Sequence, residues 1–157
     1  MRLEDEIVQK EFLDENHKAL VNIIYTYSFL INKMSGFFKS RSITRQQFNV
    51  LRILRGQYPN AANLNLIKER MLDKMSDASR IVERLRIKNL IDRRQSRHDR
   101  REVEITINQA GLELLEETDL EISKFYRMFD SLNPEELKLL NTLLDKFRQG
   151  ANEPPLL

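Results

Sequence analysis

The chain has 157 residues, about one domain's worth, of which 41% are hydrophobic and 32% charged, with a formal net charge of +2. It contains no cysteine and no run of about 18 apolar residues, which excludes disulfides, thiolate chemistry, cysteine-ligated zinc and a membrane-spanning helix. The N-terminal residues lack the charged-then-apolar layout of a signal peptide, so we expect a cytoplasmic protein. His17 and His98 lie far apart in the sequence, and we predict no metal site and no other cofactor.

Charge is distributed unevenly along the chain. Residues 16–68 carry eight basic and no acidic side chains, and residues 80–101 carry nine basic and three acidic ones. Acidic side chains dominate residues 1–15 and 113–136 instead. A basic middle between acidic ends is typical of a protein that binds an anionic partner, although a solvated charged surface explains the same pattern equally well.

The first predicted element is a long helix over residues 7–38, where apolar side chains recur three or four apart. A helix of about 32 residues would be roughly 48 Å long, which exceeds the width of a small domain. We therefore expect part of its apolar face to pack against a second subunit.

Two shorter helices follow. Thr44 and Gln47 have the spacing of a capping box, which predicts a helix beginning there and ending at residues 56–60, a segment with glycine and proline. A second helix is predicted over residues 64–71, with Asn63 as its cap.

The next segment changes from helical to alternating spacing. We predict a turn at residues 72–75 and a helix over residues 76–88, which Asn89 can end in the left-handed conformation. Residues 90–94 and 103–107 are predicted strands, because apolar and polar side chains alternate in the second of them.

The polar, basic segment between the strands, residues 95–102, is longer than a two-residue hairpin turn and should be an exposed loop. Asn108 is the expected cap of a long helix over residues 109–129. Asn133, followed by Pro134 and two glutamates, predicts the start of a last helix.

This order of elements is that of a winged helix-turn-helix. The predicted fold is mainly α with a small β-hairpin wing (α+β), in which a winged helix-turn-helix domain is joined to a helical dimerisation domain. The helix over residues 76–88 can enter the major groove of DNA as the recognition helix. No nucleophile–base spacing, phosphate-cradling glycine loop or metal motif occurs, so we predict that the protein is not an enzyme.

The predicted DNA contacts lie at the start and along the outer face of the recognition helix and in the basic loop. Serine and arginine can hydrogen-bond base edges, and clustered loop cations can surround a phosphodiester. The nine residues are Ser76, Asp77, Ser79, Arg80, Arg84, Arg97, His98, Arg100 and Arg101. Each arginine alone could be an ordinary surface group. Together, on elements in the order of a winged helix-turn-helix, the arginines favour a DNA-binding function. The alternative function is a helical protein-interaction module that has lost DNA binding, and the dense loop arginines argue against it.

Three segments, SRIVERL (79–85), KNLIDR (88–93) and DRREV (99–103), resemble the MarR family of bacterial transcription regulators. The resemblance covers about residues 7–149 and implies a homodimer that binds a palindromic operator, most often as a repressor. It places the helical dimerisation region at residues 1–38 and 109–149 and the winged domain at residues 39–108. Residues 150–157 are expected to form a flexible tail.

By position, Arg80 matches a DNA-contacting residue of the family, and Arg100 and Arg101 match its wing arginines. Glu83 stands where the family usually has an aspartate that often pairs with the residue matching Arg101. The resemblance therefore implies a Glu83–Arg101 salt bridge that orients the wing. Asn89 replaces the family's usual glycine, a change that the left-handed conformation tolerates. The missing cysteines exclude the family's thiol-based peroxide sensing, and the lack of a histidine cluster argues against zinc sensing.

Many members of the family bind small aromatic or phenolic anions, which implies a possible small-molecule effector. Aromatic and basic side chains that could line such a site are Tyr25, Tyr27, Phe37, Phe38, Arg41 and Phe48. Aromatic residues at helical spacing more often pack in a core, and this interpretation is favoured here. The ligand residues are therefore left unassigned.

Overall fold

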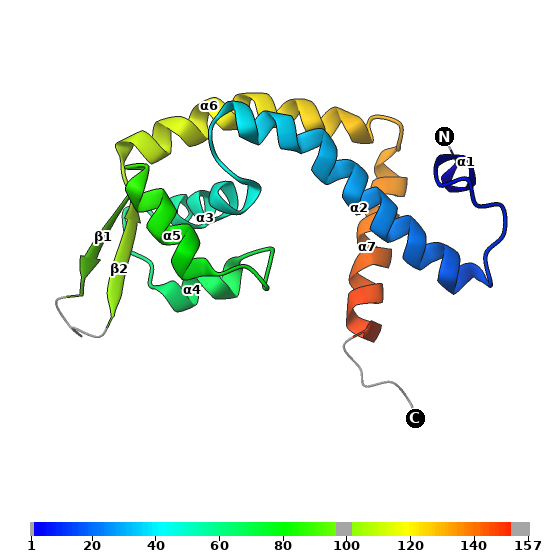
Figure 1. Ribbon diagram of the computed structural model, residues 1–157, viewed down its shortest axis with the longest axis horizontal. Coiled ribbons are helices and arrows are strands. Elements are labelled where there is room, and N and C mark those ends of the chain that lie inside the picture. The colour runs from blue at the N-terminus through cyan, green and yellow to red at the C-terminus, as the bar shows by residue number, and fades with distance from the viewer. Residues whose placement is uncertain (1, 97–101, 152–157) are drawn as a thin grey trace. The chain divides into compact units, whose positions relative to one another are not determined.

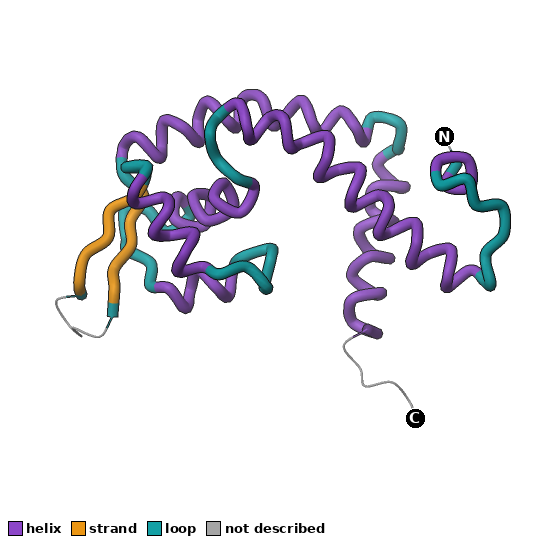
Figure 2. The backbone as a smooth tube through the Cα atoms, in the orientation of Figure 1, coloured by secondary structure: helices purple, strands orange, loops and turns teal. Residues whose placement is uncertain are grey.

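The structure, a computed structural model, describes residues 2–96 and 102–151. The chain forms two compact units, Met1–Leu115 and Glu116–Leu157, which divide within one helix. The described chain is mainly helical, and its strands are confined to one antiparallel hairpin (Figures 1 and 2). The predicted fold class is confirmed. None of the described helices is both long enough and apolar enough to cross a membrane.

The first unit begins with α1 (Leu3–Glu6) and α2 (Glu15–Ser40), and here the prediction of one continuous helix over residues 7–38 was wrong. Residues 7–14 leave the helix, with Val8 at a φ of 55°. Asp14 then starts α2, because its carboxylate accepts a hydrogen bond from the His17 amide at 2.7 Å. This carboxylate satisfies one of the amides that a helix start leaves without a partner, so the chain begins a new helix at this point.

The predicted starts of the next two helices are confirmed. In α3 (Arg45–Arg55), the Gln47 amide donates to Thr44 Oγ1 and the Thr44 amide donates to Gln47 Oε1, each at 3.1 Å. In α4 (Leu64–Arg70), the Leu66 amide donates to Asn63 Oδ1 at 2.9 Å. Both caps are built from residues within one turn, which is why the sequence reveals them.

The core of the winged domain forms where α3, α4, α5 (Ala78–Ile87) and the hairpin meet. Each helix contributes the apolar side chains of one face, spaced three or four residues apart. The largest fully buried apolar side chains of these elements are Val50, Leu51, Leu54, Ile67, Leu85, Ile91 and Ile105.

The hairpin pairs β1 (Ile91–Gln95) with β2 (Val103–Ile107) in antiparallel register, with Ile91 opposite Ile107. The first strand starts one residue later than predicted, because the Leu90 amide still bonds to the Leu85 carbonyl at the end of α5. Asn89 has the left-handed φ of 55° that was predicted. Ile105 also exchanges two 2.8 Å backbone hydrogen bonds with Ala62, which fixes the hairpin to the segment before α4.

The helix α6 (Gln109–Tyr126) starts in the first unit, where it passes very close to the end of the hairpin. Asn108 caps it as predicted, because its Oδ1 accepts from the Gly111 amide at 3.0 Å. A Cβ atom at Gly111 would lie 2.2 Å from the Leu90 carbonyl oxygen and 2.7 Å from Ile107 Cγ1. Only glycine fits this approach without a shift of the neighbouring backbone.

The second unit contains the rest of α6, a 3₁₀ helix (Arg127–Phe129) and α7 (Pro134–Ala151). The predicted start of the last helix is confirmed, since Asn133 and Glu136 exchange hydrogen bonds of 2.8 and 2.9 Å. α7 continues through Ala151, past the predicted boundary of the tail at residue 150. Residues 152–157, which were predicted to be flexible, lie outside the described residues.

Candidate nucleic-acid interface

The turn between α4 and α5, residues 72–77, is fixed by hydrogen bonds to α3 and within itself. The Leu72 amide donates to Asn49 Oδ1 at 2.9 Å, and Gln46 Nε2 reaches Asp73 Oδ2 at 3.5 Å. The Asp73 carboxylate also accepts from the Met75 amide at 3.2 Å and from Ser76 Oγ at 2.8 Å. The Ser76 hydroxyl is the main reason why the pKa of Asp73 is lowered, because it stabilises the ionised carboxylate.

The recognition helix α5 begins at Ala78, two residues later than the predicted start at Ser76. Asp77 is its cap, and its Oδ1 accepts from the Arg80 amide at 3.1 Å. The predicted DNA contacts Ser76 and Asp77 thus lie in the turn and at the cap, and both side chains have partners within the protein. Their contact with DNA stays a prediction.

Replacing Asp77 with alanine should destabilise the protein by about 1 kcal/mol, because the first turn of α5 loses a hydrogen-bond acceptor. Urea unfolding measured side by side with the wild type checks this value. Asp77→Ser is the matched control, since serine is an equally good cap and should restore most of the stability. An alanine variant as stable as the wild type would mean that the cap has no energetic role.

The outer face of α5 exposes three of the predicted contact residues. Ser79, Arg80 and Arg84 are exposed, whereas Ala78, Val82 and Leu85 on the opposite face are buried. This division follows from the helical period, which places residues three and four apart on the same side. Among the described residues no ion pair involves Arg80 or Arg84. Both guanidinium groups are therefore available to an external anion or base edge.

Glu83 links α5 to the wing. Its carboxylate pairs with Arg86 Nη2 at 2.8 Å and with Arg93 Nη1, from β1, at 3.5 Å. The two arginines, Arg86 first, lower the pKa of Glu83 because they favour its ionised form. The predicted partner, Arg101, lies outside the described residues, so the Glu83–Arg101 salt bridge stays a prediction. Sequence reasoning missed Arg93, although strand alternation places it on the same face as the buried Ile91.

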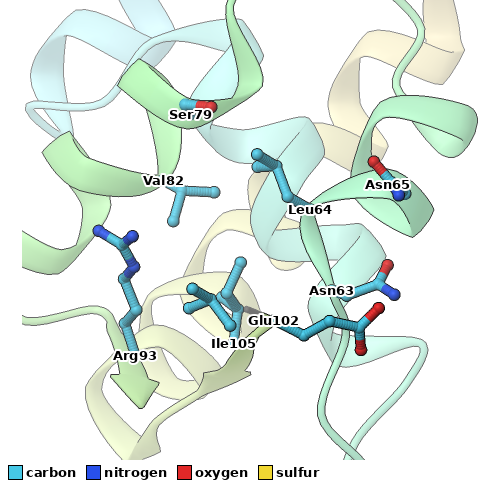
Figure 3. A pocket seen from close by; sticks show the side chains of 9 residues that line it. Asn63, Leu64, Asn65, Ser79, Val82, Arg93, Glu102 and Ile105 are labelled. Atoms are coloured by element: carbon cyan, nitrogen blue, oxygen red, sulfur yellow. The ribbon is translucent and has the colours of Figure 1, made fainter. Parts of the chain in front are cut away.

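The wing meets the recognition helix across a small open cavity of about 280 Å³. Figure 3 shows Arg93 extending from β1 toward α5 beside Val82, with Ile105 below. The residues that line this space are Asn63, Leu64, Asn65, Ser79, Val82, Arg93, Glu102, Val103 and Ile105. Besides the apolar packing of the hairpin in the core, the Glu83–Arg93 ion pair and the Ala62–Ile105 bridge join the hairpin to α5 and to the segment before α4.

The strands of the wing carry a cross-strand ion pair between Arg94 and Glu104, with Nε and Oε2 2.8 Å apart. The other four predicted DNA contacts belong to the loop between the strands and lie outside the described residues: Arg97, His98, Arg100 and Arg101.

Most of the aromatic residues considered for a ligand site pack within the protein. The Phe38 and Phe48 rings are buried with their centroids 5.3 Å apart, and Arg41 lies over the Phe37 ring at 4.2 Å. The Tyr25 hydroxyl donates to Glu6 at 2.6 Å. These contacts agree with the favoured interpretation of the stripe as packing.

A larger cavity, of about 690 Å³, lies between the end of α2 and the start of α3. Apolar side chains line much of it, and two cationic side chains, Lys39 and Arg45, also line it. Sequence reasoning did not single out these two cations. The full lining is Ile31, Met34, Ser35, Phe38, Lys39, Ser42, Ile43, Thr44, Arg45 and Gln46. Within the described part of the chain, no cluster of three histidine or acidic side chains could hold a metal ion.

Residues 43–103 match the model of the MarR family. The fold is similar to a MarR transcription factor from Planctomyces limnophilus (26% identity, 86% of this chain and 98% of that one, TM-score 0.67). It is also similar to BpsR from Bordetella bronchiseptica, whose DNA binding is regulated by 6-hydroxynicotinic acid (24% identity, 83% and 98%, TM-score 0.70). A third similar structure is the organohalide-sensing regulator RdhR bound to 2,4-dichlorophenol (20% identity, 88% and 82%, TM-score 0.79). No curated protein matches the sequence.

The matched family and the similar structures are transcription regulators, which confirms the prediction that the chain is not an enzyme. The family match falls on the winged domain, where the recognition helix and the wing are built. Residues 43–103, which form a winged helix-turn-helix domain, therefore match the MarR family of transcription regulators, as the sequence predicted.

Proposed function

We propose that the protein is a dimeric repressor that binds a palindromic operator, with one α5 helix of each subunit in the major groove. The observation that carries this proposal is the exposed pair Arg80 and Arg84 on a recognition helix whose preceding turn is fixed against α3. Arginine at the start of a recognition helix can pair with guanine through two hydrogen bonds. Three loop arginines are assigned to the sugar-phosphate backbone, where cations bind DNA of any sequence: Arg97, Arg100 and Arg101.

Binding to the DNA upstream of the protein's own gene tests this proposal. Fluorescence anisotropy with that duplex and a scrambled duplex should give tight, preferential binding that weakens steeply with salt. If the upstream duplex fails, a selection from random duplexes decides whether the protein has an operator elsewhere. Failure of both would leave the alternative of a protein-interaction module.

Dimer formation is proposed because two helices expose apolar side chains at helical spacing. Stripes of this kind need a covering surface, and a second copy of the chain supplies one. The exposed residues are Leu20, Ile24 and Tyr27 on α2, and Leu139, Leu143 and Phe147 on α7.

Replacing Ile24 with glutamate should shift the protein from dimer to monomer, because a charge placed in an apolar interface must be desolvated without a partner. Light scattering on a size-exclusion column, over a dilution series, measures the change. Leu72→Glu is the control, since Leu72 is 80% exposed but lies outside both helices, and this variant should stay dimeric. A monomeric wild-type protein at micromolar concentration would contradict the proposal.

Glu83 is proposed to act on DNA binding through the wing rather than by touching DNA. Glu83→Ala should weaken operator binding by about threefold, because β1 loses its ion pair with α5 and a solvent-exposed pair makes only a modest contribution. Anisotropy titrations of the wild type, Glu83→Ala and Arg93→Ala test this. The two variants should weaken binding to a similar extent, and the double variant should lose little more. Unchanged affinity in Glu83→Ala would contradict the role.

A small aromatic or phenolic ligand is the proposed releasing signal. DNA binding by BpsR is regulated by 6-hydroxynicotinic acid, and RdhR was solved with 2,4-dichlorophenol bound. Both proteins share this fold. The 690 Å³ cavity suits a molecule of that size, and Arg45 or Lys39 could hold its carboxylate or phenolate. Thermal-shift and operator-competition assays with 6-hydroxynicotinic acid and 2,4-dichlorophenol, on the wild type and Arg45→Ala, test the site. No change in melting temperature or operator affinity at millimolar concentration would argue against these two ligands.

A further inference from the structure

In the turn before the recognition helix, the polar side chains form hydrogen bonds within the protein and the apolar side chains are exposed. Asp73 and Ser76 bond to each other, and Asp77 caps α5. Lys74 donates its ammonium group to the last carbonyls of α4, those of Lys68 and Glu69. The two apolar side chains of the turn, Leu72 and Met75, are 80% and 95% exposed.

Met75 is held in this exposed position by a fixed backbone. Its own amide bonds to Asp73, and the turn is joined to α3 through the Leu72–Asn49 hydrogen bond. Met75 stands two residues before the cap of α5, beside the end of the helix where base contacts are made in helix-turn-helix proteins. A side chain at this position therefore lies at the edge of the candidate interface.

The chemistry of the groove limits what Met75 can contact there. A thioether donates no hydrogen bond, so phosphate oxygens offer it no favourable partner. In the major groove the apolar group that a base pair presents is the 5-methyl of thymine. Burying a methyl-sized group is favourable by about 0.8 kcal/mol, which corresponds to a roughly fourfold change in affinity.

We propose that Met75 packs against the 5-methyl group of a thymine in the major groove beside α5, and so helps to determine the operator sequence. The inference rests on the proposed function, because it requires that α5 binds DNA. It adds an apolar sequence contact to the polar ones assigned to Ser79 and Arg80.

Substitution of thymine by deoxyuridine tests the contact directly, because this change removes only the 5-methyl group. The probe is the duplex of highest affinity selected by the protein from a random pool. Each thymine of one half-site is replaced in turn, and Kd is measured by anisotropy. The affinity of the wild type should fall roughly fourfold when one particular thymine is replaced by deoxyuridine. Met75→Ala should bind the thymine and deoxyuridine versions of that duplex equally. Met75→Leu, which keeps an apolar side chain, should retain the sensitivity.

Leu72→Ala is the matched control, because Leu72 is exposed in the same turn but lies farther from α5 along the chain. It should keep the wild-type pattern. The inference would be overturned if no thymine position distinguished the wild type from Met75→Ala, or if Leu72→Ala lost the same sensitivity. Failure of the selection to yield any preferred duplex would instead reject the proposed function, so the two failures are distinguishable.

Discussion

Replacing Arg80 with alanine is expected to weaken operator binding by about 1–3 kcal/mol per half-site and to relax sequence preference at one base pair. Arg80 is exposed on α5, and it has no ion-pair partner among the described residues. Its backbone amide is already bonded to Asp77, so the helix that presents it is fixed. The loss should therefore come from the missing base contact and not from a disturbed helix.

The measurement is anisotropy on the selected operator and on duplexes with one changed base pair, over a salt series. Arg100→Ala is the contrasting variant, because a phosphate contact should weaken all duplexes alike and lower the salt slope by about one unit. Lys10→Ala, a surface lysine far from the winged domain in sequence, is the neutral control. Equal effects of Arg80→Ala and Arg100→Ala on operator and random DNA would refute this division of roles.

Replacing Gly111 with alanine is expected to destabilise the protein by about 1–3 kcal/mol. Two effects oppose each other at this helical position. Alanine is favoured over glycine within a helix by about 1 kcal/mol. The added Cβ, however, would stand 2.2 Å from the Leu90 carbonyl oxygen, and relief of that contact requires α6 to move away from the hairpin. The steric effect should exceed the gain in helix propensity.

Gly36→Ala provides the matched control, because the same substitution in α2 places a Cβ with nothing within 4 Å. Urea unfolding should show the two variants moving in opposite directions, with Gly36→Ala more stable than the wild type. A Gly111→Ala variant of wild-type stability would mean that α6 can shift at little cost. DNA affinity of the variant would then report whether that shift reaches the wing.

Features that depend on residues close together in the chain could be predicted from the sequence. The capping box of Thr44 and Gln47 and the cap at Asn133 are satisfied within one helical turn, so their spacing alone predicts where the helices begin. The left-handed Asn89 and the alternating strand at residues 103–107 are local in the same sense. The family resemblance rested on three short segments within residues 79–103, and it predicted the winged domain.

Features that depend on residues far apart in the chain could not be predicted, because they follow from how separate elements pack together. Gln46 and Asn49 fix the turn before α5 only because α3 packs against that turn. Arg93 reaches Glu83 only because β1 packs beside α5. The spacing of the aromatic side chains on α2 favoured packing over a ligand site, but only the contact between Phe38 and Phe48 identifies a packing partner. A sequence pattern gives the spacing of side chains along one element, whereas the partner across a contact follows from the packing of separate elements.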